Sequence, residues 1–470
     1  MNSQKSHNKR FIRSNIKRPT ASGKDTRMQI VHTDGPSTAE VDLPELIDRL
    51  PIGSFQIRVL LICAAVLFVD GFDTQAIGYV APALAQEWKL ARGALGPVFS
   101  AGLFGLMLGA IIFGTLADRI GRKRIIVIAT TAFGVGTLAT MLAQDATVLI
   151  VLRFLTGLGL GGAMPNAVAL TAELAPHRRR ATMVMAMFAG FSIGAALGGL
   201  LAAALIPAFG WRSVFLVGGL VPLALAPVLA AALPESIRYL ALLRGRDCDV
   251  AVLLRRVDPE LRIAEDARFV VPEPRLTGLP VAHLFAERRG GITLLLWVVF
   301  FMSLLDLYLL SNWLPTVLND LGVSVSAAAI IGAMLQVGGV AGTFALGRVI
   351  DRFSFRALAV TYLCAATAVG AIGLSSHAIA LVTIAIFAAG FCIVGGQIAS
   401  NALAATYYPT AIRATGMGWA LGIGRIGSIV GPLIGGAMLA SHVEVETLFL
   451  VAAIPALLAA ATALLLARIV

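Results

Sequence analysis

The run VLLICAAVLFVDGFDTQAIGYVAPALA, residues 59–85, is apolar but carries two acids near its centre, Asp70 and Asp73. An α-helix needs about 20 apolar residues to cross a lipid bilayer, and this run is longer than that. At a spacing of three residues the two carboxylates lie on one face of the helix. Each aspartate near the bilayer centre costs about 2.5–3.5 kcal/mol on insertion scales, so two in one helix indicate a function.

The composition of the whole chain is that of a membrane protein. Of the 470 residues, 58% are hydrophobic and 13% are charged, whereas soluble domains are about 25% charged. Twelve apolar runs predict an all-α polytopic membrane protein, with twelve transmembrane helices in two six-helix pseudo-repeats. The expected spans are residues 56–80, 93–117, 124–143, 147–174, 181–206, 213–233, 291–315, 326–350, 356–374, 379–406, 414–439 and 446–467.

These runs divide the chain into four parts. We expect a disordered basic tail over 1–55, an N-terminal bundle over 56–233, a central cytoplasmic loop over 234–290 and a C-terminal bundle over 291–470. Within the tail, residues 41–50 are expected to form a short interfacial helix that leads into the first span.

Lysine and arginine gather in every second connection between the runs. They follow the second, fourth, eighth and tenth runs and also populate the central loop and the tail. Because short loops rich in these residues stay in the cytoplasm, both termini are expected to be cytoplasmic, in a protein of the cell inner membrane. The net charge of +11 therefore reflects topology and does not predict nucleic-acid binding.

Two enzyme signatures occur, but both lie in predicted membrane helices. Residues 157–162 match a dinucleotide-binding fingerprint and residues 190–194 a nucleophile elbow, yet each motif requires a preceding β-strand. The four cysteines and six histidines show neither disulfide nor ligand spacing. We therefore predict no enzyme, no metal site and no cofactor.

An internal repeat recurs at a fixed separation of 233 positions. Gly114, Asp118 and Arg119 are followed at that distance by Gly347, Asp351 and Arg352, and the glycines of the fifth span by those of the eleventh. Asp73 is repeated as Asp306, whereas Asp70 is followed by Ser303. One ungapped separation indicates a duplicated six-helix unit in parallel orientation.

A cluster of acids, bases and glycines follows the second span. We interpret it as a latch in which acid and base bridge neighbouring helix ends; the alternative is a basic topology anchor, which would not explain the acid and the paired glycines. The second copy has residues 353–355 (Phe-Ser-Phe) in place of the Gly-Arg run. The predicted latch residues are Gly114, Asp118, Arg119, Gly121, Arg122, Lys123, Asp351 and Arg352.

A sparse set of polar residues remains inside the spans. Counting positions along antiparallel spans makes a pair between Asp73 and Arg153 feasible, and Asp306 with Arg425 could play the equivalent parts. Such intramembrane charges are functional candidates by default. Static salt bridges between helices are the alternative.

These residues resemble a known family. The sequence around Gly114, Asp118 and Gly121 is similar to the signature of the major facilitator superfamily, and Asp70-Gly-Phe-Asp73 resembles that of its aromatic acid:proton symporters. The resemblance implies inward symport of a hydroxybenzoate-like carboxylate with protons by alternating access, in a lipid bilayer and by a monomer. Proton coupling is assigned to Asp70, Asp73 and Asp306. The substrate-binding candidates are Arg153, Arg425, Tyr308, Asn312, Gln336, Gln397 and Asn401.

Other functions remain open from the residues. Residues 234–239 resemble a sugar-porter motif, which keeps a sugar, polyol or other organic-anion symporter as the alternative. A drug exporter of the same fold and a membrane sensor that binds without transport are also possible. Two intramembrane arginines, Arg153 and Arg425, favour a carboxylate, because a guanidinium matches a carboxylate in two hydrogen bonds.

Overall fold

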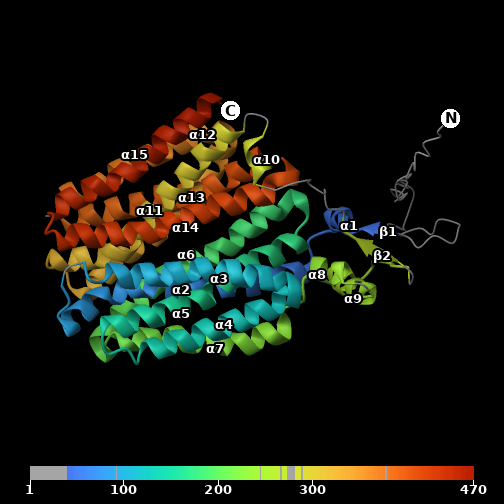
Figure 1. Ribbon diagram of the computed structural model, residues 1–470, viewed down its shortest axis with the longest axis horizontal. Helices are drawn as coiled ribbons and strands as arrows, with labels where there is room; N and C mark the ends of the chain where they lie inside the picture. The colour runs from blue at the N-terminus through green and yellow to red at the C-terminus, as the bar shows by residue number, and fades with distance from the viewer. Residues whose placement is uncertain are drawn as a thin grey trace, which may run out of the picture.

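The computed structural model describes residues 40–91, 93–243, 245–264, 267–271, 281–286, 289–375 and 378–469 (Figure 1). Two groups of long helices lie side by side and together contain twelve segments that are long and apolar enough to cross a membrane. The predicted all-α class with twelve spans is confirmed. Such helices satisfy their backbone hydrogen bonds internally, which is what a lipid environment demands.

The first group, the N-terminal bundle, contains six of these helices. They are α2 (Ser54–Trp88), α3 (Gly96–Ile120), α4 (Arg122–Thr140), α5 (Ala146–Leu174), α6 (His177–Phe209) and α7 (Arg212–Ala232). The second group, the C-terminal bundle, contains α11 (Gly290–Asp320), α12 (Val325–Leu374), α13 (Ile379–Tyr407), α14 (Thr410–Ala440) and α15 (Val445–Ile469). Several helices extend a few residues beyond the expected spans.

The helix α12 contains two spans that the sequence predicts as separate. The expected interruption at residues 351–355 is a kink at Ser354, whose φ of 50° and ψ of −131° are not helical. In the N-terminal bundle the same position is Gly121, which separates α3 from α4 with φ of 100°. Positive φ suits glycine and strains most other residues, so the two copies make the same bend with different residues.

The separation of 233 positions also holds in three dimensions. A Cβ atom added to Gly105 would lie 2.1 Å from the carbonyl oxygen of Phe154, and one added to Gly338 would lie 2.1 Å from that of Phe387. Both partners in the second contact are 233 positions from those in the first. The two bundles therefore share one packing scheme, in which glycines allow helix backbones to touch.

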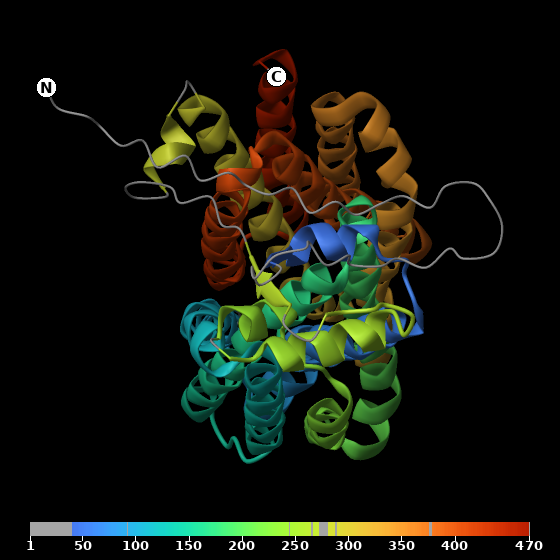
Figure 2. The same cartoon turned by 90° about the vertical axis from the view of Figure 1, so that its right-hand side faces the viewer.

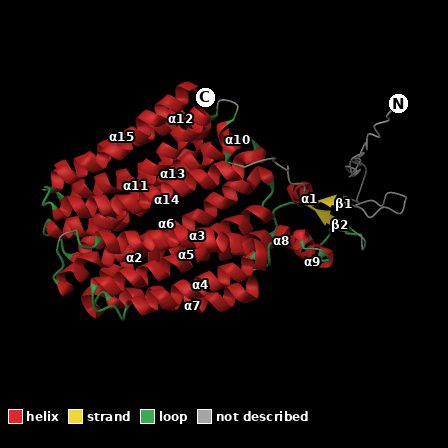
Figure 3. Ribbon diagram, in the orientation of Figure 1, coloured by secondary structure: helices red, strands yellow, loops and turns green. Residues whose placement is uncertain are grey.

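A small module covers the end of the N-terminal bundle at which α2 begins (Figure 2). Its strands β1 (Glu40–Asp42) and β2 (Arg268–Val270) pair in parallel, and its helices are α1 (Leu43–Arg49), α8 (Ile237–Leu242) and α9 (Asp247–Val257). The short α10 (Ala282–Phe285) precedes α11. These two strands form the sheet in the described part of the chain, and the other regular elements there are helices (Figure 3). We call this end of the molecule the module end.

The module corrects the prediction of a disordered tail up to residue 55. Residues 40–55 are ordered because Leu43, Leu46 and Leu50 are buried in one apolar cluster with Leu254 and Phe269 of the central segment. The expected short helix over 41–50 is present as α1, although its first residues form β1 instead. The remainder of the predicted tail, residues 1–39, lies outside the described residues.

The two bundles meet closely at the end opposite the module. Gln86 of α2 donates a hydrogen bond of 2.9 Å from Nε2 to Oδ1 of Asn319 in α11, and these residues are repeat counterparts, 233 positions apart. Ser100 of α3 donates to the carbonyl oxygen of Ile429 in α14 at 2.8 Å. These two hydrogen bonds join the bundles at the end opposite the module.

Candidate functional site

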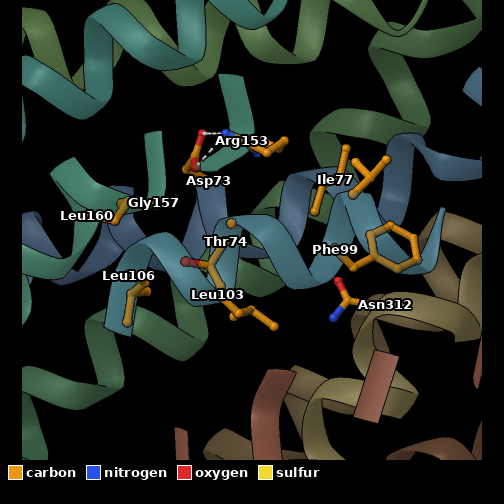
Figure 4. A pocket seen from close by; sticks show the side chains of 12 residues that line it. Asp73, Thr74, Ile77, Phe99, Leu103, Leu106, Arg153, Gly157, Leu160 and Asn312 are labelled. Atoms are coloured by element: carbon orange, nitrogen blue, oxygen red, sulfur yellow. Dashed lines mark hydrogen bonds and ion pairs between the residues drawn. The ribbon is translucent and has the colours of Figure 1, made fainter. Parts of the chain in front are cut away.

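Asp73 and Arg153 form the predicted ion pair, inside the N-terminal bundle (Figure 4). The Arg153 Nη2 atom lies 3.1 Å from Oδ2 and 3.3 Å from Oδ1 of Asp73. Thr137 of α4 donates a 2.6 Å hydrogen bond to Oδ1, and the guanidinium carbon lies 5.3 Å from the ring centroid of Phe215 in α7. Four helices thus surround a charge pair whose side chains are 1% and 4% exposed.

A narrow cavity borders this pair, lined mainly by α2, α3 and α5 (Figure 4). Asp73, Thr74, Phe99 and Arg153 line it together with Asn312 of α11. Its volume of about 20 Å³ is enough for a single water molecule and too small for an aromatic ring. The space beside the Asp73–Arg153 pair therefore fits a water molecule but not an aromatic ring.

Asp70 lies one turn from Asp73 but interacts with the other bundle. Its Oδ1 accepts a 3.1 Å hydrogen bond from Thr74, while Oδ2 is buried without a partner among the described residues. The cation that interacts electrostatically with it is Arg425 of α14. The two acids of one helix face therefore interact with arginines of different bundles.

Arg425 bridges the two bundles through neutral partners. Its Nη1 donates to the Tyr308 hydroxyl of α11 at 3.2 Å, and its Nη2 contacts the Met164 sulfur of α5 at 3.7 Å. The expected equivalence of an Asp306–Arg425 pair is wrong, because both Asp306 carboxylate oxygens are buried without a hydrogen bond in the described structure. The repeat counterpart of Arg153 is Ile386, so no arginine occupies the equivalent place.

The remaining substrate-binding candidates lie in the C-terminal bundle. Asn312 lines the water-sized cavity and donates from Nδ2 to the carbonyl oxygen of Tyr308 at 2.8 Å. Gln336 makes a long 3.5 Å contact with the Ser311 hydroxyl. The side-chain carbonyl oxygens of Gln397 and Asn401 are buried without partners in the described part of the chain, so both can still accept a hydrogen bond.

Two glutamates outside the predicted latch residues contact the first predicted latch. Glu173 of α5 pairs with Arg122, and Glu235 accepts from the backbone N–H of Lys123 at 3.0 Å. A Cβ atom on Gly121 would lie 2.3 Å from Oε2 of Glu235, so the missing side chain makes room for that carboxylate. The only sequence signal for Glu235 was the sugar-porter-like motif at residues 234–239.

Other latch residues are placed at the module end with fewer contacts. Asp118 is exposed and makes no hydrogen bond or ion pair within the described residues, whereas the Arg119 carbonyl oxygen accepts from the Tyr239 hydroxyl at 3.1 Å. Gly114 has open space beside it. The Arg352 guanidinium carbon lies 5.2 Å from the Phe353 ring centroid, and the Asp351 side chain lies outside the described residues.

Thr137 and Phe215 are the other residues that sequence reasoning missed. Threonine and phenylalanine are ordinary in membrane helices, so neither had a signal of its own. In the parts of the chain that the structure describes, no three His, Cys, Asp or Glu side chains are grouped as a metal site would require. The chemistry of the site therefore consists of carboxylates, guanidinium groups and hydroxyls.

The chain is similar to known proteins in sequence and in fold. The sequence model of the Major Facilitator Superfamily matches residues 63–271 and 296–469. The gallate transporter of Pseudomonas putida is 44% identical over 90% of this chain and 95% of its own, and the 4-hydroxybenzoate transporter PcaK of Pseudomonas aeruginosa is 43% identical over 92% and 96%.

A crystal structure of a bacterial homolog of the human lysosomal transporter Spinster shares the fold. Its TM-score is 0.69 at 20% identity, and the match covers 89% of this chain and 98% of that one. Twelve apolar helices and a family match over both bundles lead to one conclusion. The chain is a multi-pass membrane protein that belongs to the Major Facilitator Superfamily.

Proposed function

We propose that the protein imports an aromatic carboxylate together with protons, by alternating access of a site between the two bundles. The relatives that are 43–44% identical over nearly the whole chain are named transporters of gallate and of 4-hydroxybenzoate, which supports a substrate of this class. The module end, which is rich in arginine, is then cytoplasmic, as is the rule for short basic loops. We infer that the protein acts as a monomer in the inner membrane.

The observation that carries the proposal is the environment of Arg425. This guanidinium lies between the bundles, and its described hydrogen-bond partners are a hydroxyl and a thioether, both neutral. A carboxylate could replace the weak sulfur contact with two charge-assisted hydrogen bonds. Arg153, in contrast, already binds Asp73, so we assign the substrate carboxylate to Arg425 and a structural or gating part to Arg153.

Asp70 can couple this site to a proton. As a charged carboxylate it competes with the substrate anion for Arg425, because both acids are attracted to the same guanidinium. Once Asp70 takes up a proton, the positive charge of Arg425 is available to the substrate. Proton and anion then bind together, which is the requirement for symport.

The polar acceptors of the C-terminal bundle can recognise ring substituents. Gln397 and Asn401 each have a buried carbonyl oxygen without a hydrogen bond in the described structure. A ring hydroxyl can donate to such an acceptor, and the analogue that lacks the hydroxyl leaves the acceptor unpaired. We infer that these two side chains, with Tyr308, Asn312 and Gln336 of the same bundle, set the preference for hydroxylated acids.

The test is uptake of radiolabelled 4-hydroxybenzoate into proteoliposomes. An acidic exterior should accelerate uptake by the wild type, and Arg425→Lys should weaken it by roughly 10–200-fold, because a bidentate carboxylate contact contributes about 1.5–3 kcal/mol. Arg413→Lys on the same helix is the matched control and should behave as the wild type. Equal uptake by both variants would overturn the assignment of Arg425.

A further inference from the structure

Three hydroxyl groups are joined into a chain inside the C-terminal bundle. The Tyr362 hydroxyl of α12 donates to Oγ of Ser303 in α11 at 2.8 Å and lies 3.1 Å from Oγ of Ser400 in α13. All three residues are at most 1% exposed. Ser303 lies one turn before Asp306 in α11, on the side toward the module end.

Asp306 follows Ser303 of this chain by three residues in α11. It is 1% exposed, and neither carboxylate oxygen has a hydrogen-bond partner in the described structure. Tyr362 is the titratable group that interacts with it electrostatically. An unpaired, buried carboxylate must exist mostly as the neutral acid, because a bare charge in an apolar site is too costly.

The ionisable groups of the neighbouring helices are engaged elsewhere. From α2, Asp73 is paired with Arg153 and Asp70 interacts with Arg425, and from α14, Arg425 is bonded to Tyr308. The charged residues of α15 stand at its two ends, and the polar groups that α13 places near mid-helix are uncharged. Over the described residues, then, Asp306 is buried and has no counter-ion.

The hydroxyl chain is peculiar to the C-terminal bundle. The repeat counterparts of Tyr362 and Ser400 in the N-terminal bundle are Ala129 and Ala167, which have no polar side chain. Room for the ring comes from Gly396, where a Cβ atom would lie 3.1 Å from Cζ of Tyr362. The chain is therefore not a by-product of the duplication, and the packing around it is adjusted to hold a tyrosine.

We propose that Asp306 holds a second transported proton, and that Ser303, Tyr362 and Ser400 carry it toward the module end. The inference rests on the proposed function, since it presupposes proton coupling. On release, the O–H bond of Asp306 breaks and its proton passes, through one water, to the Ser303 oxygen. Transfer in this direction requires the hydrogens to turn first, because Tyr362 donates to Ser303 and Ser400 donates to the Gly396 carbonyl oxygen in the structure. Each hydroxyl then accepts one proton and releases its own to the next oxygen, so the chain keeps its number of hydrogens. The last proton leaves Ser400 for solvent at the module end.

The experiment compares two transport modes of the same reconstituted protein. Exchange of labelled for unlabelled 4-hydroxybenzoate requires no net proton movement, whereas accumulation driven by a pH gradient does. Tyr362→Phe should slow gradient-driven uptake roughly tenfold, the size of one net hydrogen bond, and leave exchange within about twofold. The matched control is Tyr408→Phe, because the Tyr408 hydroxyl makes a similar buried bond to Thr293 at 3.3 Å, away from Asp306.

Asp306→Asn provides the second arm. An amide mimics the neutral acid, so exchange should persist, while gradient-driven uptake should lose part of its dependence on pH and one proton per substrate. If Tyr362→Phe behaves as Tyr408→Phe, or if Asp306→Asn keeps the wild-type proton count, the inference fails. If Tyr362→Phe loses exchange as well, the Ser400→Ala variant is measured next, because it breaks the hydroxyl chain without altering the tyrosine ring. Gradient-driven uptake by Ser400→Ala at the wild-type rate would then contradict the proposal. A wild type that ignores the pH gradient would instead overturn the proposed function.

Discussion

Asp73 and Asp306 occupy equivalent positions in the two bundles, yet their surroundings differ at every position that bears on charge. Asp73 is bound by Thr137 and Arg153, and Phe215 covers the guanidinium. The repeat counterparts of these three partners are Gly370, Ile386 and Leu448, none of which can donate a hydrogen bond from its side chain. Equivalent positions of the repeat thus hold an ion-paired aspartate, Asp73, in one bundle and an unpaired aspartate, Asp306, in the other.

The difference teaches that duplication preserved the helix packing but not the electrostatics. Glycine contacts repeat at 233 positions because close backbone approach depends on the shape of the helices. Charge pairing depends on three or four side chains that touch the carboxylate, and those can change without disturbing the packing. The N-terminal bundle has become the charge-paired half, and the C-terminal bundle holds the acid that can be neutral.

Substituting each of the two aspartates by asparagine should give the largest difference in stability between the bundles. Asp73→Asn leaves the Arg153 charge buried and uncompensated, which should destabilise the protein by about 3–5 kcal/mol. Asp306→Asn removes no hydrogen bond seen among the described residues and should change stability by less than about 1 kcal/mol. Melting temperatures in detergent micelles measure both. Equal losses of stability in the two variants would show that Asp306 has a further partner.

Thr137 sharpens the same contrast with a smaller effect. Thr137→Val keeps the shape of the side chain but removes the 2.6 Å hydrogen bond to Asp73. A hydrogen bond to a charged group contributes about 1.5–3 kcal/mol, so the melting temperature should fall. Thr137→Ser retains the hydroxyl and is the control. A serine variant as unstable as the valine variant would assign the effect to packing.

The two latch bends give the smallest effects and opposite signs. Gly121→Ala should destabilise by about 1–3 kcal/mol, because φ is positive and the new methyl meets Glu235. Ser354→Gly should stabilise by roughly 0.5–1 kcal/mol, since glycine adopts the φ of 50° without strain. Thermal unfolding of the two variants measures both changes. A loss of stability in Ser354→Gly would show that the serine side chain has a role of its own.

Much of the architecture could be predicted from the order of residues. Apolar runs of spanning length determine the twelve helices, because lipid-exposed backbone must bond internally. The separation of 233 positions determines the duplicated packing, and the acids and arginines within the spans mark the site. The contact between Asp73 and Arg153 followed from depth along antiparallel helices and is confirmed.

Only the tertiary structure decided which groups are paired. Arg425 contacts Tyr308 and Met164 and interacts electrostatically with Asp70, because depth in the membrane does not say which way a side chain points around its helix. The order in residues 40–49 depends on a strand more than 200 positions away. The contacts of Thr137, Glu173 and Tyr362 are made with neighbours that are distant in sequence. Local pattern determines helices, whereas the partners of a buried charge are a property of the assembled bundle.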